Sequence, residues 1–213
     1  MKNVCTIVPF KGEGHKSRLS HVMGAGQRLE FSLLMLDGVL KAIARAGLKP
    51  RCLVVSSNES AIRRSRLAGC RVVKERSAEG VNEAVRKGVA SSKEDTFLVV
   101  PSDLPWLTGR DLKEALGLRV SGADMVISPS RAFDGTNLLL FSRDNRIALS
   151  YDSNSFWNHL ASAASRGLKV AVYTGQGVVH DVDSVEDLDD LVRTRANTPS
   201  ARFARKVLDR WHC

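Results

Sequence analysis

The sequence predicts an α/β protein in which a mainly parallel, mixed β-sheet is covered by helices on both faces. Short β-branched and apolar runs alternate along the chain with segments of helical periodicity, which is the pattern of successive βα units. Several of these runs are apolar throughout, as expected for strands that are buried on both faces. Charged residues follow two of the runs directly, at the strand ends where open α/β sheets bind ligands.

Each expected strand coincides with one apolar run. The seven expected strands cover residues 4–9, 52–57, 70–74, 96–101, 123–128, 137–142 and 168–173. A further apolar pair, Val178-Val179, precedes His180. It is expected to begin an eighth, short strand that ends in carboxylates.

The longest expected helix runs from Gln27 to Ala46, where leucine and isoleucine recur near a 3.6-residue period, and Gly47 ends it. Shorter helices are expected at 80–91, 109–116 and 155–166, and a capping box opens another at Ser184. A basic amphipathic helix is expected from about Pro199 to the end. It is expected to dock on the domain or on a second subunit.

Length and composition indicate one domain spanning 1–213. The chain is 43% hydrophobic, its longest apolar runs are too short to cross a bilayer, and charge and proline follow the start closely, unlike a signal peptide. The cysteines form no CxxC pair, and those that lie in expected strands indicate reduced, buried thiols. These features favour a cytoplasmic protein without a membrane partner.

The formal net charge of +9 has three interpretations: a solvated basic surface, a site for anionic small molecules, or nucleic-acid binding. The cations are spread along the chain, and the aromatic residues, at 6%, do not interleave with the basic clusters. A platform for single-stranded nucleic acid requires that interleaving. Nucleic acid is therefore the least favoured partner.

Three cations, Lys11, Lys16 and Arg18, fall within a span of eight residues just after the first expected strand, in a loop that also contains two glycines. Backbone N–H groups and cations converge at such a strand end, which is suited to an anionic ligand. The loop contains neither GxGxxG nor GxxxxGK[ST]. It therefore indicates phosphate binding without a dinucleotide or nucleoside-triphosphatase signature.

Carboxylates follow two further apolar runs. Asp103 comes just after the run 96–101, and Asp181 and Asp183 alternate in the expected short strand. Mg²⁺ prefers oxygen ligands and commonly binds one or two carboxylates together with substrate phosphates. The alternative interpretation is that Asp103 caps a turn and that Asp183 caps the helix that follows it in the sequence.

A fourth group supplies hydroxyl and amide side chains near a glycine. Thr136 and Asn137 open one expected strand, and Ser155 opens a helix whose N-terminus is suited to an anion. On chemistry alone, ordinary turn and N-cap roles explain the same residues better. Asn82 lies in the first turn of the expected helix 80–91. One interpretation is that it faces the base or sugar of a nucleotide; the other is that it is an ordinary asparagine at a helix start.

Taken in this order, the motifs resemble the 2-phospho-L-lactate guanylyltransferases of coenzyme F420 biosynthesis. The similarity extends from the start to about Val192. It rests on IVPFKGEGHKSRLS, EGVNEAV, PSDLPWL, DGTNLLLF, the pair Ser155-Phe156 and HDVDSVEDL. The resemblance implies a Rossmann-like three-layer α/β/α nucleotidyltransferase fold, dependence on Mg²⁺, and a homodimer.

The resemblance also implies roles for the residues singled out above. Lys11, Lys16 and Arg18 would hold the nucleotide phosphates during catalysis, with Asn82 and Ser102 also at the nucleotide; Asp103, Asp181 and Asp183 would hold the metal; Thr136, Asn137, Asp152 and Ser155 would lie at the phosphorylated acid. The expected reaction transfers GMP from GTP to 2-phospho-L-lactate and releases pyrophosphate.

One position departs from the family pattern. The family usually has a glycine in the turn shortly before the serine at 155, whereas this chain has Asp152-Ser153-Asn154. A carboxylate is unexpected beside an anionic substrate, so phosphoenolpyruvate and 3-phosphoglycerate stand as alternative acceptors. An alternative of another class is a non-catalytic module that binds nucleotides or nucleic acid.

Overall fold

The computed structural model describes residues 3–11, 16–194 and 196–211, and within them seven strands form one sheet. The strands are β1 (Val4–Phe10), β2 (Cys52–Ser56), β3 (Arg71–Lys74), β4 (Thr96–Val99), β5 (Met125–Pro129), β6 (Thr136–Ser142) and β7 (Val170–Val172). All seven coincide with strands expected from the apolar runs. Every residue of β1 is buried, because this strand is central and is covered on both faces.

The order across the sheet is β3-β2-β1-β4-β6-β5-β7. Strand β6 runs antiparallel to both of its neighbours, β4 and β5, and the remaining neighbours pair in parallel. The mainly parallel, mixed sheet predicted from the sequence is therefore confirmed. The chain places β2 and β3 on one side of β1 and then crosses to β4 on the other side. A ligand site is expected at the carboxyl ends of β1 and β4, where this direction reverses.

The helices are α1 (Ala25–Arg45), α2 (Glu59–Leu67), α3 (Val81–Ala90), α4 (Gly109–Val120), α5 (Ser155–Ala164), α6 (Gln176–Val179), α7 (Val185–Arg193) and α8 (Pro199–Trp211). Short 3₁₀ turns lie at Ser17–Leu19, Lys49–Arg51 and Arg143–Asn145. The sequence analysis did not predict α2 or α6. Its other helices are present, including α7, where the Ser184 hydroxyl accepts from the backbone N–H of Asp187.

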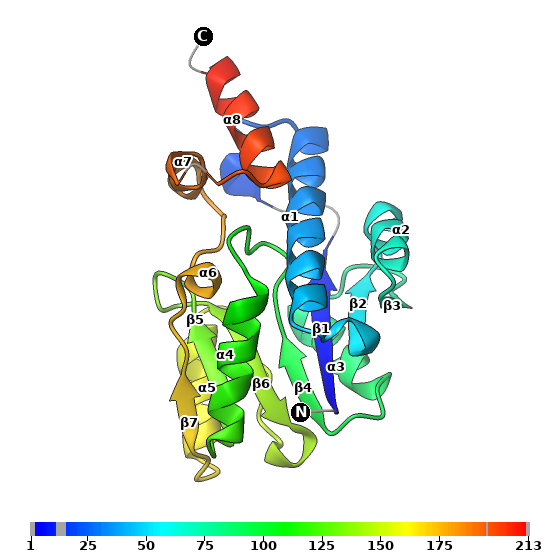
Figure 1. Cartoon of the computed structure of the whole chain (residues 1–213), viewed down its shortest axis with the longest axis vertical. Coiled ribbons are helices and arrows are strands. Elements are labelled where there is room, and N and C mark those ends of the chain that lie inside the picture. Colours follow the sequence, from blue (N-terminus) through cyan, green and yellow to red (C-terminus); the bar gives the residue numbers. More distant parts are fainter. Residues whose placement is uncertain (1–2, 12–15, 195, 212–213) are drawn as a thin grey trace.

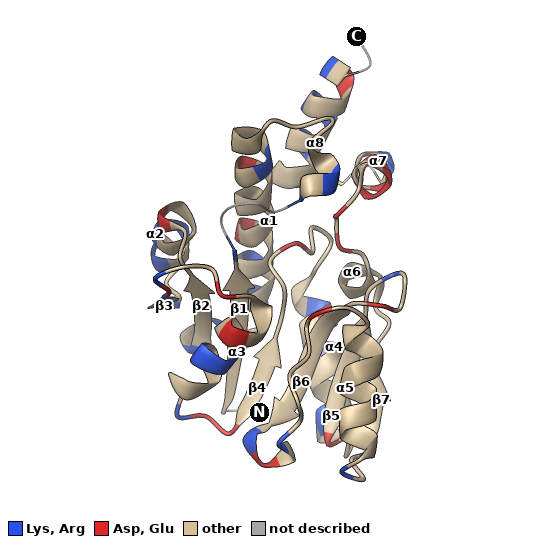
Figure 2. Ribbon diagram, turned by 180° about the vertical axis from the view of Figure 1, so that it is seen from behind, with Lys and Arg blue, Asp and Glu red and all other residues tan. Residues whose placement is uncertain are grey.

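The helices form a layer on each face of the sheet. Figure 1 shows α1 and α4 in front of the strands, and Figure 2, from behind, shows α3 and α5 in front. One buried cluster joins alternate residues of the sheet to α1, α2 and α4, and a second joins the other residues to α3 and α5. The three-layer α/β/α architecture is therefore confirmed.

The C-terminal helix α8 packs on its own chain. Its buried residues Ala201, Ala204, Val207 and Leu208 join a third cluster with the end of α1 that extends beyond the sheet and with α7. The rings of Phe31 and Phe203 are stacked there, with centroids 6.1 Å apart. Of the two expected docking partners of this helix, the structure shows the first, because α8 packs on the domain of its own chain.

The expected short strand that begins at Val178-Val179 is wrong. Val178 and Val179 end helix α6, and residues 180–183 form an irregular segment before α7. The two valines have high β propensity, but they follow Gly175, which opens a helical turn. The Val178 side chain is fully buried in the cluster that joins the sheet to α1, α2 and α4. Asp181 and Asp183 therefore lie on an irregular segment and not on one face of a strand.

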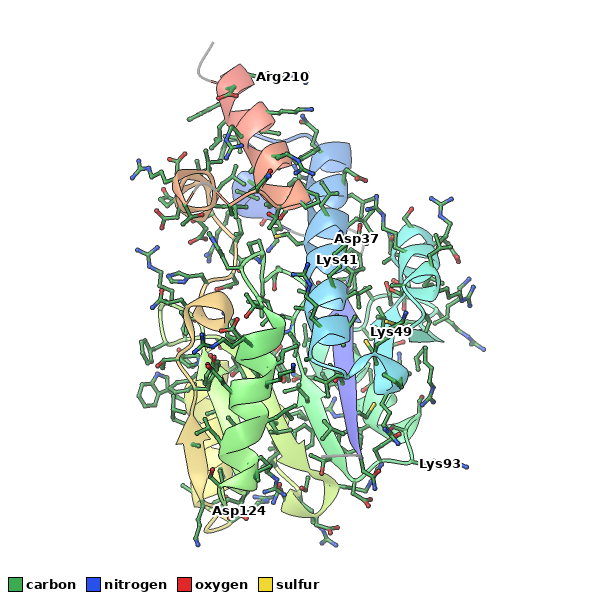
Figure 3. The ribbon with its side chains drawn as sticks, in the orientation of Figure 1. Asp37, Lys41, Lys49, Lys93, Asp124 and Arg210 are labelled. Carbon is green, nitrogen blue, oxygen red and sulfur yellow. The ribbon has the colours of Figure 1, made fainter. Side chains whose placement is uncertain are left out.

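The charged residues are distributed over the molecule. Figure 3 shows Lys93 near one end of the molecule and Arg210 at the other, with Lys41 and Lys49 between them. Cys5, Cys52 and Cys70 are free thiols and are buried, as expected. Among the described residues, none of the helices combines the length and the apolar composition that crossing a membrane requires.

Candidate active site

A cleft of about 240 Å³ lies at the carboxyl ends of β1 and β4, where the sheet topology predicts a ligand. It is lined by the ends of both strands, by Ser32 of α1, by Val81 at the start of α3, and by Tyr151. Five residues singled out in the sequence also line it: Lys11, Lys16, Ser102, Asp103 and Asp183. The cleft therefore brings together segments that are far apart in the sequence.

The Lys16 ammonium lies at the centre of this group, between two carboxylates. Lys16 Nζ is 3.0 Å from Asp103 Oδ2 and 2.7 Å from Asp183 Oδ1, and the Lys16 side chain is only 5% exposed. Burial alone would lower the pKa of Lys16, but the two carboxylates outweigh it and hold that pKa above its usual range. The ammonium therefore stays charged and neutralises part of the acidic cluster.

The backbone of Lys16 is held in an uncommon conformation. Its φ and ψ angles are 57° and 42°, in the left-handed region, and it immediately precedes the 3₁₀ turn Ser17–Leu19. A non-glycine residue adopts this conformation at a cost of about 1–3 kcal/mol. The two ion contacts of the side chain help to offset that cost.

Asp181 is the third carboxylate of the cluster. Burial, reinforced by the negative charges of Asp103 and Asp183, raises its pKa to about 6, and a hydrogen bond from Asn137 partly opposes the shift. The Asn137 amide nitrogen lies 3.2 Å from Asp181 Oδ1 and 3.0 Å from the carbonyl oxygen of Val178. Asn137 thus anchors the irregular segment 180–183 to the start of β6.

The other cations of the first loop lie differently. Lys11 directly follows β1, is half-buried, and lines the cleft, whereas Arg18 lies exposed on the 3₁₀ turn. The stretch Gly12–His15, which includes the two glycines of the motif, lies outside the described residues. Of the three predicted phosphate ligands, the structure therefore places Lys11 and Lys16 in the cleft.

Thr136 and Ser155 meet beside the buried imidazole of His159. Ser155 Oγ donates to Thr136 Oγ1 at 3.1 Å, and His159 Nδ1 is also 3.1 Å from Thr136 Oγ1. Asn154, which precedes α5 in a left-handed conformation, provides no side-chain cap for this helix. Thr136 and Ser155, each expected at the phosphorylated acid, are thus in contact at the N-terminus of α5, whereas His159 was not singled out from the sequence.

Asn82 and Asp152 form a tie between α3 and the turn before α5. The Asn82 side chain donates to Asp152 Oδ2 at 2.9 Å and accepts from the backbone N–H of Tyr151 at 2.7 Å. Both ends of the Asn82 amide are therefore used within the protein. The Asp152 carboxylate, which departs from the family pattern, thus has a partner of its own in this chain.

Two buried hydroxyl groups in the cleft have no hydrogen-bond partner among the described residues: Ser32 Oγ and Tyr151 Oη. Burial raises the pKa of Tyr151, so its hydroxyl stays protonated and able to donate. A buried polar group without a partner is rare and costs about 1–3 kcal/mol, which a bound ligand would recover. The sequence showed no signal for either residue, because neither belongs to a charged or glycine-rich motif.

A larger hollow, of about 660 Å³, lies between the segment after β4 and helices α6 and α7, around Trp106 and His180. It contains none of the residues singled out in the sequence for binding. Size alone therefore does not locate the site. The smaller cleft is the better candidate, because cations, carboxylates and unpartnered hydroxyl groups converge there.

This arrangement is suited to polyphosphate chemistry. A cation held between carboxylates neutralises phosphate charge, and oxygen ligands at the same point are suited to a divalent metal. Comparison with known families agrees with that chemistry: residues 4–209 match the family model described as "Guanylyl transferase CofC like".

The chain belongs to the CofC-like guanylyl transferase family. It is therefore a nucleotidyltransferase enzyme, as predicted from the motifs. The chain is 35% identical over 190 residues to the phosphoenolpyruvate guanylyltransferase of Rubrobacter xylanophilus, covering 87% of this chain and 92% of that protein.

Other relatives in the family carry different acceptor names at similar identity. The 2-phospho-L-lactate guanylyltransferase of Methanothermobacter thermautotrophicus is 30% identical, covering 95% of this chain and 90% of that protein. The 3-phospho-D-glycerate guanylyltransferase of Phenylobacterium zucineum is also 30% identical, covering 94% of each.

Solved structures support the fold. A nucleotidyl transferase from Methanothermobacter superposes with a TM-score of 0.65 at 16% identity, covering 91% of this chain and 100% of that one. A cytidylyltransferase from Leptospira borgpetersenii superposes with a TM-score of 0.63 at 10% identity, covering 98% and 93%. At these identities the likeness establishes the nucleotidyltransferase fold of the CofC-like chain.

Proposed function

We propose that this CofC-like protein transfers GMP from GTP to 2-phospho-L-lactate, and that phosphoenolpyruvate and 3-phospho-D-glycerate are the alternative acceptors. The observation that carries the proposal is the Lys16 ammonium between Asp103 and Asp183, in the cleft at the ends of β1 and β4. Two anionic substrates and a phosphoanhydride exchange require charge neutralisation at one point, and this cluster provides it.

Two carboxylates that meet in the cleft are suited to a magnesium ion. Asp103 and Asp183 converge on the Lys16 ammonium, and their negative charges contribute to the raised pKa of Asp181. Carboxylate oxygens together with substrate phosphates are the ligands that Mg²⁺ prefers. Asp103 and Asp183, with Asp181, would hold the ion, which when bound supplies further neutralisation of phosphate charge.

The transfer step needs alignment more than it needs a base. A phosphate monoester is largely dianionic at neutral pH, so one of its oxygens can attack the α-phosphorus of GTP without losing a proton. The new P–O bond joins the acceptor phosphate to GMP, the bond between the α-phosphorus and the bridging oxygen breaks, and pyrophosphate leaves. Lys11, Lys16 and Arg18 would hold the nucleotide phosphates in line for that exchange.

The acceptor acid would be held at the start of β6 and of α5. Thr136 and Ser155 supply hydroxyl groups there, and Asn137 connects this end to Asp181. The three acceptors named for the relatives occur at 30–35% identity, so overall identity does not favour one of them strongly. The acceptor is therefore a matter for experiment.

The test is pyrophosphate release by the purified protein with GTP and Mg²⁺, comparing 2-phospho-L-lactate, phosphoenolpyruvate and 3-phospho-D-glycerate. Release that depends on one acid supports the proposal and names the acceptor. Asp103→Asn is expected to remove most of the activity, whereas Asp124→Asn, at an acid far from the cleft (Figure 3), should leave it unchanged. A fully active Asp103→Asn protein would contradict the metal assignment.

Failure of release with all three acids and all four nucleotides would favour the alternative of a non-catalytic binding module. That module would bind oligonucleotides in a strongly salt-dependent way. Three clustered carboxylates disfavour it, because they repel a phosphate backbone. The homodimer that the family resemblance implies is tested separately, by light scattering of the purified protein.

A further inference from the structure

His159 is a buried imidazole that neither the motifs nor the proposed reaction uses. It lies on α5 and is 0% exposed. The ring of Tyr151, which lines the cleft, packs edge-on against it, with centroids 5.0 Å apart. A histidine held this deeply, between the cleft wall and a pair of hydroxyl groups, is placed to organise both.

The hydrogen bonds of His159 determine which nitrogen carries the proton. Nε2 lies 3.1 Å from the backbone nitrogen of Ser150, and a backbone N–H only donates, so Nε2 is the acceptor. Burial lowers the pKa of His159 to about 4, opposed only by a hydrogen bond with the backbone of Ser155, so the ring is neutral at pH 7. Its single proton is therefore on Nδ1, where it is shared between Thr136 Oγ1, at 3.1 Å, and the backbone carbonyl of Ser155, one turn earlier on α5.

Thr136 Oγ1 thus receives two hydrogen bonds. One comes from His159 Nδ1 and the other from the Ser155 hydroxyl, both at 3.1 Å. A hydroxyl oxygen has two acceptor positions and one proton. Both acceptor positions are filled by the protein, so the Thr136 proton is directed to a third partner, which must be an acceptor.

The position of Thr136 results from an irregularity in the sheet. In the pairing of β5 with β6, Ser128 lies opposite Leu138, whereas Pro129 lies opposite Thr136, so Asn137 is an extra residue. Such a bulge re-aims neighbouring side chains. Thr136 contacts His159 on the α5 side, while Asn137 contacts Asp181 on the α6 side. Two adjacent residues thus connect the hydroxyl pair to the carboxylate cluster.

We propose that His159 is a positioning residue of the acceptor site: its Nδ1–H fixes Thr136 as a hydrogen-bond donor to the phosphate or carboxylate oxygens of the phosphorylated acid. The inference rests on the proposed function, because it takes that acid as the third partner. At neutral pH these oxygens are acceptors only. A threonine free to rotate would spend part of its time with its proton turned toward Ser155.

Two amide substitutions separate the two hydrogen bonds of His159. In His159→Asn the side-chain NH₂ replaces Nδ1–H and keeps the donor to Thr136, but the acceptor for Ser150 is lost. In His159→Gln the side-chain oxygen replaces Nε2 and keeps the acceptor for Ser150, but the donor to Thr136 is lost. Ser162→Ala is the matched control, since Ser162 Oγ on the same helix accepts a similar loop hydrogen bond, from the backbone N–H of Ala148 at 2.8 Å.

The measurement is the KM for each substrate in the pyrophosphate-release assay, together with calorimetric binding of the three acids. We expect His159→Gln to raise the KM and the dissociation constant of the acceptor about tenfold while the KM for GTP stays unchanged. His159→Asn should restore the acceptor KM to within about threefold of the native value, and Ser162→Ala should not change it. If His159 had only a structural role, the acceptor KM of each variant would change in step with its loss of stability. The expected difference between the Gln and Asn variants does not follow that pattern.

The outcomes also separate this inference from the proposed function. Equal acceptor constants in the Gln and Asn variants, or the same rise in Ser162→Ala, would overturn the role of His159 while leaving the reaction intact. Acid binding without turnover would refute the reaction, and the binding constants of the variants would still test His159. A native protein that binds none of the three acids would overturn both.

Discussion

Replacing Lys16 by Met removes the charge at the centre of the cleft while it preserves the length and apolar stem of the side chain. The native ammonium makes two ion contacts, at 3.0 Å to Asp103 and 2.7 Å to Asp183, and is almost entirely buried. In Lys16→Met these two carboxylates and Asp181 remain together without that cation. We expect the variant to be less stable and to depend on Mg²⁺ for part of its stability.

The magnitude follows from how far each carboxylate is exposed. Removing one partner of a buried ion pair costs roughly 3–5 kcal/mol, whereas an exposed pair contributes about 0.2–1 kcal/mol. The side chains of Asp103 and Asp183 are 29% and 51% exposed, so solvent screens much of their charge. We therefore expect the free energy of unfolding to fall by about 2 kcal/mol in metal-free buffer.

The assay is urea unfolding at pH 7.5, with a chelator and then with Mg²⁺. A cation at about 100 times its dissociation constant stabilises the folded state by about 2.7 kcal/mol, so Mg²⁺ should restore Lys16→Met more than it stabilises the native protein. Pyrophosphate release should fall at least about 100-fold. Lys87→Met is the control, because Lys87 also bridges two carboxylates, Glu75 and Glu79, outside the cleft lining. The reasoning is refuted if Lys16→Met is as stable as the native protein, or if Mg²⁺ stabilises both equally.

Three further predictions concern single groups. Tyr151→Phe removes a buried hydroxyl that has no partner in the described structure, so we expect unchanged or higher stability and a KM for GTP or the acceptor raised about tenfold; lower stability with unchanged KM values would contradict this. His159 has a pKa of about 4 in the folded protein against 6.5 ordinarily, so between these pH values protons bind the unfolded chain preferentially. Stability that is fully present above pH 6.5 should therefore decline by about 3 kcal/mol as the pH falls to 4, and His159→Gln should lack this component of the urea titration. Gly88→Ala would bring its new methyl group 2.8 Å from Ile7 Cγ2, so unfolding should become easier by about 1–3 kcal/mol, and an unchanged melting temperature would show that α3 can shift away from β1.

The strands of the sheet were predicted well because buried parallel strands consist of consecutive apolar residues, which are easy to find in a sequence. Strand β4, for example, follows from Phe97-Leu98-Val99 alone, and all three residues are fully buried. Helix α2 was missed because its segment is dominated by arginine and serine, and only Ala61, Ile62 and Ser65 face the core. Its stability depends on the Asn58 cap and on packing against α1, which periodicity over so few apolar residues does not reveal.

The site was predictable where charge and strand ends coincide. Lys16, Asp103 and Asp183 were each expected at the edge of the sheet, but their direct contact depends on where the irregular segment after α6 places Asp183. The expected strand there was wrong, so spacing alone did not give the geometry. Tyr151 and His159 were not predicted, because their roles depend on burial and on hydrogen bonds to distant residues.

The central claim is that the protein joins GMP to a phosphorylated acid at the site formed by Lys16, Asp103 and Asp183. The most direct measurement is ³¹P NMR of the protein with GTP, Mg²⁺ and each of the three acids in turn, with Asp103→Asn as the control. The account predicts a new pair of coupled diphosphate resonances and an equal amount of pyrophosphate with one acid, and neither with Asp103→Asn. Spectra that show only GTP, or only its hydrolysis to GDP or GMP, would contradict it.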